Sequence, residues 1–173
     1  MKVLIACSMI EDELNEIIRR HNLSDEMKVL WMERGHHEYP ERLNEVVSDE
    51  IRKAEDMGAD EILLAYGLCF DDCVNMMLCP KARIERNLLE TGKMYLTRGW
   101  TAEKGSLKTM LDEAKERYGD KRGIKAIKLM LGAYHYLTIL DTGCYDLGPV
   151  KAYADECATQ LDLNVEIRPG SIR

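Results

Sequence analysis

Short apolar runs alternate with amphipathic segments of helical length along almost the whole chain. This alternation is typical of a parallel sheet flanked by helices. We therefore expect an α/β fold with three layers, in which helices cover both faces of a mostly parallel, Rossmann- or flavodoxin-like sheet of five or six strands. The expected strands are residues 2–7, 28–33, 61–66, 93–97, 136–140 and 164–167, and the segment 70–92 is expected to be mostly helical.

The length of 173 residues suits one domain, and no Gly/Ser-rich or low-complexity linker divides the chain. We therefore expect a single α/β domain over residues 1–173. The sequence ends just after Pro169-Gly170-Ser171, which resembles the start of a helix. This resemblance leads us to expect that a C-terminal helix is missing.

Charge and hydropathy limit the classes of partner. A net charge of -7 and a pI near 5.2 argue against a phosphate-tracking surface, so we expect no nucleic acid partner. No apolar run approaches the roughly 20 residues of a membrane span. The N-terminal sequence also lacks the pattern of a secretory signal. We therefore expect a cytoplasmic protein without a membrane partner, in which the six cysteines are thiols, metal ligands or buried apolar residues.

Three cysteines stand where an expected strand gives way to its loop: Cys7, Cys69 and Cys144. In open α/β sheets, the carboxyl ends of the strands line the crevice that binds ligands. Adjacent strands lie about 4.8 Å apart, so the strand order 2-1-3-4-5 would make Cys7 and Cys69 neighbours. In that order Cys144 would start about 10 Å from Cys69 and would need its loop to fold back.

Each candidate ligand also has a plainer interpretation. A capping box of Ser8 and Glu11 is expected to begin the helix after Cys7. The dipole of that helix would favour a thiolate at Cys7, although many cysteines are simply buried. Cys73 follows Cys69 by four residues, a spacing that allows both to face one way but matches no standard zinc or iron-sulfur motif. His37 lies in the loop after the second strand, where it is a metal ligand, a base or a solvated histidine.

Several other residues at strand ends suit contact with a cofactor. The acidic residues Asp141 and Asp146 could bind a metal, orient a ligating histidine or cap the next helix, and capping is the default expectation for Asp146. Glycines at strand ends allow close approach of a ligand but also serve tight turns, and here they are Gly67, Gly99 and Gly143. No dinucleotide, P-loop, zinc-protease or serine-hydrolase motif is present in the sequence.

Five blocks together resemble, in the same order, an archaeal and bacterial family called domain of unknown function 1638. They are Leu4-Ile5-Ala6-Cys7, Gly35-His36-His37 through Pro40, Tyr66-Gly67-Leu68-Cys69, Tyr95 to Trp100, and Asp141-Thr142-Gly143. The resemblance covers nearly the whole chain and points to Cys7, His37, Cys69 and Asp141 as site residues. Where the family usually has Pro-Arg-Ala-His-Asp-Cys, this chain has Pro80-Lys81-Ala82-Arg83-Ile84-Glu85. The missing His and Cys would have to be replaced by Cys73, Cys79 or Cys144.

The resemblance also implies anaerobic organisms and an association with corrinoid or one-carbon methyl transfer. It makes a corrinoid or methyltransferase protein a candidate partner, with any corrinoid bound only through that partner. A homo-oligomer is also compatible with the sequence, which does not decide whether the protein is an enzyme.

Three readings of the cysteines follow. The leading hypothesis is a protein that binds zinc or an iron-sulfur cluster through Cys7, Cys69 and Cys144, with Cys73 or His37. The alternative is a metal-free thiol enzyme or small-molecule-binding domain, in which Cys7 or Cys69 is the nucleophile and His37 its base. In the third, the cysteines only pack in a structural or partner-binding protein.

Overall fold

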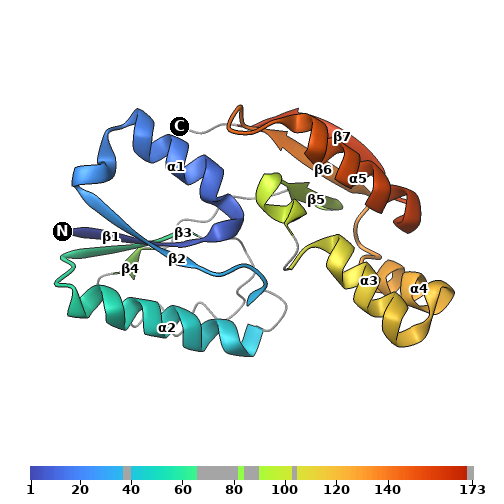
Figure 1. Ribbon diagram of the computed structural model, residues 1–173, viewed down its shortest axis with the longest axis horizontal. Helices are drawn as coiled ribbons and strands as arrows, with labels where there is room; N and C mark the ends of the chain where they lie inside the picture. Colours follow the sequence, from blue (N-terminus) through green and yellow to red (C-terminus); the bar gives the residue numbers. More distant parts are fainter. Residues whose placement is uncertain (37–39, 66–81, 84–89, 103–104, 171–173) are drawn as a thin grey trace. The chain divides into compact units, whose positions relative to one another are not determined.

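The computed structural model of the chain describes residues 1–36, 40–65, 82–83, 90–102 and 105–170. The chain divides into two compact units, Met1–Asn87 and Leu88–Arg173. Each unit contains its own parallel sheet and its own hydrophobic core (Figure 1).

The first unit contains a four-stranded parallel sheet in the order β2-β1-β3-β4. Its strands are β1 (Lys2–Cys7), β2 (Met27–Met32), β3 (Glu61–Ala65) and the two-residue β4 (Ala82–Arg83). The central strand β1 is almost continuously apolar and buried, as expected for a parallel strand between two layers. The order β2-β1-β3 is the one that makes the carboxyl ends of β1 and β3 neighbours.

Helices lie on opposite faces of this sheet, α1 (Glu11–Arg20) on one and α2 (Pro40–Asp56) on the other (Figure 1). Short 3-10 helices, η1 (Ser8–Ile10) and η2 (Leu23–Asp25), stand before and after α1. Val3, Ile5 and Ile62 of the sheet pack with Leu43 and Val47 of α2 in the core of this unit. The three layers expected from the sequence are therefore present in the first unit.

The expected capping box of Ser8 and Glu11 is wrong. The Ser8 hydroxyl donates instead to the Met32 carbonyl oxygen at 2.7 Å, and α1 begins at Glu11 without a side-chain cap. The Ser8 hydroxyl is thus oriented toward the end of a neighbouring strand, and no side-chain cap hydrogen bond forms at the start of η1 or of α1. The carboxyl ends of β1 and β2 are therefore joined by this hydrogen bond.

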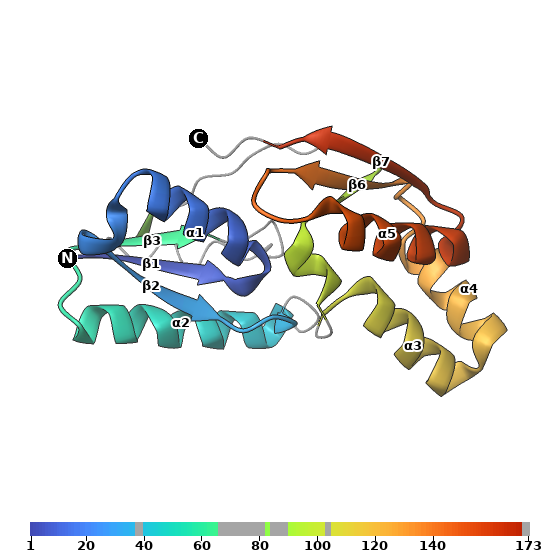
Figure 2. The same ribbon diagram turned by 45° about the horizontal axis from the view of Figure 1, so that its top comes forward.

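The second unit contains a three-stranded parallel sheet in the order β5-β6-β7. The strands are β5 (Lys93–Leu96), β6 (Tyr136–Asp141) and β7 (Asn164–Pro169), and the 3-10 helix η5 (Arg98–Thr101) follows β5. The helices are α3 (Leu107–Tyr118), α4 (Asp120–Met130) and α5 (Leu147–Leu161). Their buried residues form a single core with those of β5 and β6, so the described helices cover one face of the sheet (Figure 2).

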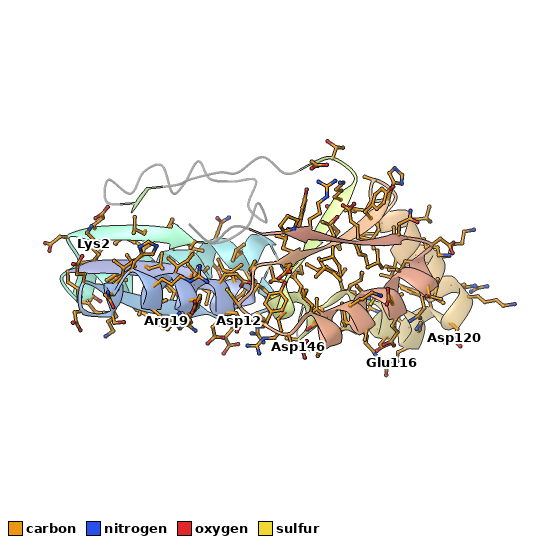
Figure 3. All side chains as sticks on the ribbon, turned by 90° about the horizontal axis from the view of Figure 1, so that it is seen from above. Lys2, Asp12, Arg19, Glu116, Asp120 and Asp146 are labelled. Carbon is orange, nitrogen blue, oxygen red and sulfur yellow. The ribbon has the colours of Figure 1, made fainter. Side chains whose placement is uncertain are left out.

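Capping residues and a glycine determine where the helices of the second unit begin and end. Ser106 caps α3 by accepting a hydrogen bond from the Thr109 amide at 3.2 Å. Gly119 separates α3 from α4 with a φ of 78°, a conformation that favours glycine. Asp146 caps α5 by accepting from the Gly148 amide at 2.9 Å, and Figure 3 shows this side chain at the start of the helix. The capping role expected by default for Asp146 is thus confirmed.

The predicted single sheet of five or six strands is wrong, because β5 pairs with β6 and not with the strands of the first unit. The α/β class and the parallel direction of the strands are confirmed. Ala82–Arg83 is a strand inside the predicted helical segment 70–92, most of which lies outside the described residues. Apolar runs indicate where strands form, but hydrogen bonds between distant segments decide which strands pair.

None of the helices in the described part of the chain combines the length and apolar character needed to cross a membrane.

Candidate functional site

Cys7 is the last residue of the central strand of the first sheet. It pairs in register with Met32 of β2, and the preceding residue Ala6 pairs with Ala65 at the end of β3. The chain leaves β1 toward β2 on one side and leaves β3 toward β4 on the other, so β1 and β3 flank a topological switch point. In open α/β sheets ligands bind outside the carboxyl ends of the strands at such a point.

The Cys7 thiol is half-buried, and burial raises its pKa above the usual thiol value. Two smaller effects oppose this shift. A hydrogen bond from the Met9 backbone and the positive charge of Arg34 both lower the pKa of Cys7. The net result is a thiol that is protonated near neutral pH. A metal ion would have to displace that proton in order to bind.

Arg34, in the loop after β2, connects this loop to the loop after β1. Its Nε donates to the Ser8 carbonyl oxygen at 3.2 Å, and its Nη2 lies 3.7 Å from Glu11 Oε2. The Arg34 side chain is about one-third exposed. We did not single out this arginine from the sequence, although a basic residue directly after an expected strand was a usable signal.

Four of the sequence-predicted site residues lie outside the described part of the chain, namely His37, Cys69, Cys73 and Gly67. Cys79, considered as a substitute ligand, lies outside it as well. His36, next to His37, is described and half-buried in the loop after β2. Whether Cys7 meets Cys69 therefore stays a prediction, although the expected pairing of their strands is confirmed.

The other predicted residues belong to the carboxyl edge of the second sheet. Gly99 is buried in η5, directly after β5, while Asp141, Gly143 and Cys144 follow one another at the end of the neighbouring strand β6. Cys7 thus ends a strand of the first sheet, whereas Cys144 lies in the loop after β6 of the second sheet. The single sheet edge that was expected to collect them does not exist.

Local hydrogen bonds hold the loop between β6 and α5. The Gly143 amide donates to Asp141 Oδ1 at 3.2 Å, and the Cys144 thiol donates to the Thr142 carbonyl oxygen at 3.6 Å. The Tyr145 hydroxyl donates to the carbonyl oxygen of Leu140. Gly143 has a φ of 70°, so its glycine is explained by the turn itself. Asp141 and Gly143 therefore have structural roles that do not require a ligand.

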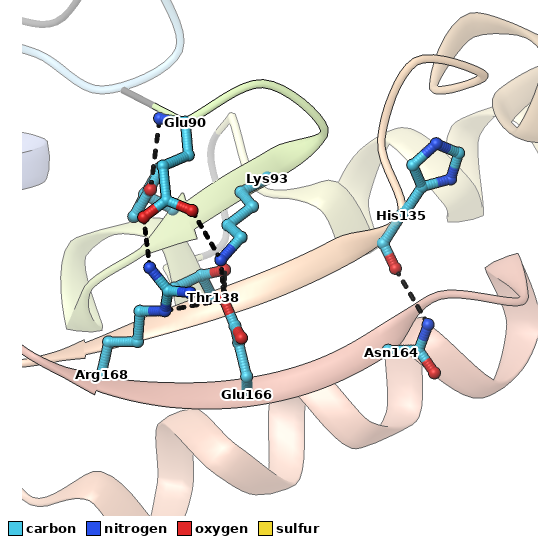
Figure 4. Close-up of polar contacts among 8 residues, drawn as sticks. Glu90, Lys93, His135, Thr138, Asn164, Glu166 and Arg168 are labelled. Carbon is cyan, nitrogen blue, oxygen red and sulfur yellow. Dashed lines mark hydrogen bonds and ion pairs between the residues drawn. The ribbon is translucent and has the colours of Figure 1, made fainter. Parts of the chain in front are cut away.

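A charged network covers the other face of the second sheet (Figure 4). Lys93 Nζ lies 2.9 Å from both Glu90 Oε2 and Glu166 Oε1, and Arg168 Nε lies 3.2 Å from Glu166. The Thr138 hydroxyl donates to Glu166 at 2.8 Å. Hydrogen bonds from Lys93 and Thr138 lower the pKa of Glu166. Since two carboxylates here face two cations, the network is balanced within itself and offers no excess charge to a ligand.

Cys157 is a cysteine with a packing role. It is fully buried in the core formed by α5 and the second sheet, and burial raises the pKa of its thiol. Its position in the apolar stripe of α5, beside Val150, Ala154 and Leu161, was visible in the sequence. This residue provides a natural comparison for the cysteines at strand ends.

No group of three His, Cys, Asp or Glu side chains within the described residues is arranged to hold a metal ion. Cys7 is nevertheless placed where a ligand would bind, at the switch point of a parallel sheet. We therefore take the carboxyl edge of the first sheet, around Cys7 and Arg34, as the candidate site.

The sequence was compared with protein families, curated proteins and solved structures. The sequence model of a family described as "Protein of unknown function (DUF1638)" matches residues 31–71 and 70–173. Neither the curated proteins nor the solved structures contained a significant match.

Proposed function

The chain belongs to the DUF1638 family of proteins of unknown function, and we propose that it binds a metal ion or an iron-sulfur cluster at the carboxyl edge of its first sheet. Cys7 is one ligand in this proposal. The observation that carries it is the position of the Cys7 thiol at the end of the central strand, beside the end of β3. Thiolates are soft ligands that favour zinc or iron-sulfur clusters over magnesium or calcium.

Cys69 is the first candidate for a second ligand. It follows Ala65 by four residues, and a chain of that length spans at most about 14 Å even when extended. Because Ala65 pairs with Ala6, the sequence keeps Cys69 within reach of the sheet edge that ends in Cys7. Cys73 and His37 are the candidates to complete the ligand set, while Cys144 would have to contribute from the second unit.

The resemblance to the family adds a proposed context. We propose that the site takes part in corrinoid or one-carbon metabolism of anaerobes, through a corrinoid or methyltransferase protein as partner. The zinc ion or iron-sulfur cluster would supply the chemical reactivity of the site. The residues of this chain would hold it, and the charge of Arg34 would favour the thiolate form of Cys7.

Anaerobic purification with metal, sulfide and visible-absorption analysis tests the proposal. We expect zinc or iron in stoichiometric amount in the natural chain, and its loss in Cys7→Ser and Cys69→Ser. Cys157→Ala is the matched control, because it removes a thiol from the core of the second unit and should leave the metal content unchanged. A colourless natural chain without zinc or iron would reject the proposal.

A second candidate function is a metal-free thiol enzyme or binding domain with Cys7 or Cys69 as nucleophile and His37 as base. The favouring observation is that the Met9 backbone and Arg34 both stabilise the thiolate of Cys7. This candidate predicts that one thiol of the metal-free protein is alkylated stoichiometrically. Because burial raises the pKa of Cys7 above the usual thiol value, its alkylation should accelerate in the alkaline range. Peptide mapping by mass spectrometry would identify the thiol, and uniformly unreactive cysteines would exclude the mechanism.

A further inference from the structure

The strand β7 forms the last position in the second sheet, and within the described residues its outer edge pairs with no strand (Figure 1). Its inner edge is fully used by β6, from the pair of Tyr136 with Asn164 to the pair of Asp141 with Pro169. An open edge of this kind is a template for another strand unless the sequence blocks it.

Hydrogen bonds at the two ends of β7 show which backbone groups face outward. The Asn164 amide donates to the His135 carbonyl oxygen at 3.0 Å, and the Gly170 amide donates to Asp141 at 2.7 Å. Because backbone groups alternate between the two edges of a strand, even-numbered residues address β6. Val165 and Ile167 therefore direct their N–H and C=O groups to the open edge.

The side chains of β7 also alternate. Val165 packs against the core of the second unit, and Ile167, on the same face, is 45% exposed. On the opposite face Glu166 and Arg168 lie side by side, 3.2 Å apart (Figure 4). The edge thus presents an uncovered isoleucine between an acidic and a basic residue.

We propose that a second copy of this chain pairs antiparallel with β7, with the two-fold axis passing at Ile167. In this register Ile167 exchanges a reciprocal pair of backbone hydrogen bonds with its own copy. The Val165 amide donates to the Pro169 carbonyl oxygen of the second copy, whereas the Val165 carbonyl oxygen gains no backbone donor there because proline has no amide hydrogen. The two isoleucine side chains meet across the axis, and the two sheets become one.

The charged side chains of β7 favour this register over the adjacent ones. An axis at Ile167 places Glu166 opposite Arg168 of the second copy, and the reverse pair forms by symmetry. An axis at Glu166 or at Arg168 would place like charges directly opposite each other, which destabilises a strand pair. The sequence of β7 is therefore complementary to itself in one register and not in the adjacent ones.

Sedimentation velocity over a concentration series tests the pairing. A single strand pair buries less surface than a standard stable interface, so we expect a concentration-dependent equilibrium between monomer and dimer. Ile167→Lys brings two ammonium groups together at the axis and should weaken the dimer by about tenfold or more. Leu129→Lys on α4 is the matched control, because Leu129 is 74% exposed and lies away from β7, and it should leave the equilibrium unchanged.

Ile167→Cys tests the register. Residues that form a hydrogen-bonded antiparallel pair have Cα atoms about 5.5 Å apart, which suits a disulfide. Mild oxidation should link two copies of this variant and not two copies of Leu129→Cys, which carries the same natural cysteines. A natural chain that stays monomeric at its highest soluble concentration, or a dimer that Ile167→Lys leaves intact, would overturn the pairing. A dimer that Ile167→Lys dissolves but Ile167→Cys does not lock would overturn the register.

Discussion

At the scale of single residues, the state of the Cys7 thiol decides between the two proposed chemistries. Its burial favours the neutral thiol, whereas the Met9 backbone and the Arg34 charge favour the thiolate. Burial is the largest of these effects, so the pKa is raised. A metal would reverse this balance by binding the thiolate directly, whereas a metal-free nucleophile would depend on Arg34.

Replacing Arg34 by Met should slow the alkylation of Cys7 in metal-free protein, because the thiolate loses a favourable charge and its pKa rises further. We expect a decrease on the order of threefold at a fixed pH below the midpoint. Iodoacetamide labelling followed by peptide mass spectrometry measures the rate. Arg34→Lys should keep most of the natural rate, and Arg52→Met on α2 should not change it. Equal rates for the natural chain and Arg34→Met would contradict the role of Arg34.

The raised pKa of Cys7 also predicts how stability depends on pH. The folded state binds this proton more tightly than the unfolded state, so the contribution of Cys7 is complete below the ordinary thiol pKa. This contribution to the free energy of unfolding is lost as the pH rises through the raised pKa of Cys7 in the folded state. Chemical denaturation of metal-free protein at several alkaline pH values should show that Cys7→Ser reduces the loss of unfolding free energy in this range relative to the natural chain. An unchanged slope in Cys7→Ser would contradict the assigned shift.

At the scale of elements, the close contact of α3 with α4 depends on Gly123. A Cβ atom built at this position would lie 2.6 Å from the backbone carbonyl carbon of Ala114 and from the Lys115 amide nitrogen. Real Cβ contacts are not this short, so any larger residue must push the two helices apart. The helix α4 begins at Asp120, so Gly123 lies in its first turns and faces α3.

Gly123→Ala should therefore destabilise the protein by about 1–3 kcal/mol, the usual range for overpacking. At an ordinary helix position the same substitution has the opposite effect, because Gly→Ala there increases the free energy of unfolding by up to about 1 kcal/mol. Gly148→Ala in the first turn of α5 is the control, because the nearest atom to its added Cβ is Asp146 Oδ1 at 3.4 Å. Urea unfolding of both variants measures the difference, and a Gly123→Ala protein as stable as the control would reject the packing argument.

At the scale of the whole molecule, the chain divides into two compact units with separate cores. The residues around the boundary, Ile84 to Leu89, contain no glycine, serine or proline, so the sequence lacks the composition of a flexible linker. We therefore propose that the two units belong to one domain and unfold together.

The two tryptophans allow a direct test, since Trp31 belongs to β2 of the first unit and Trp100 to η5 of the second. Fluorescence of Trp31→Phe and Trp100→Phe variants then reports each unit separately. We expect coincident transitions in urea, and Gly123→Ala should shift both transitions by the same amount. Separate midpoints, or a shift of the Trp100 signal alone, would show that the units are independent domains.

Sequence patterns predicted helices and strands closely where interactions between residues near one another in the chain determine the structure. The run that ends at Cys7 is a strand because its apolar, β-prone residues have partners on both faces of the first sheet. The runs that begin at Lys93 and Tyr136 are strands whose apolar residues pack on the helix-covered face of the second sheet. The N-cap at Asp146 was predictable because capping is a contact within a few residues. The Ser8 cap was mispredicted because the hydroxyl is oriented by a hydrogen bond to Met32, a partner 24 positions away that a local pattern does not reveal.

The sequence by itself determined the α/β class, the parallel strands and the position of Cys7 at a strand end, since these follow from the period and length of apolar segments. Tertiary structure alone decided that the strands form two sheets, that Arg34 lies beside Cys7 and that β7 has no partner strand on its outer edge among the described residues. The physical reason is that strand pairing depends on hydrogen bonds and contacts between segments far apart in the chain. Similar apolar strands satisfy many such pairings equally well from their sequence alone.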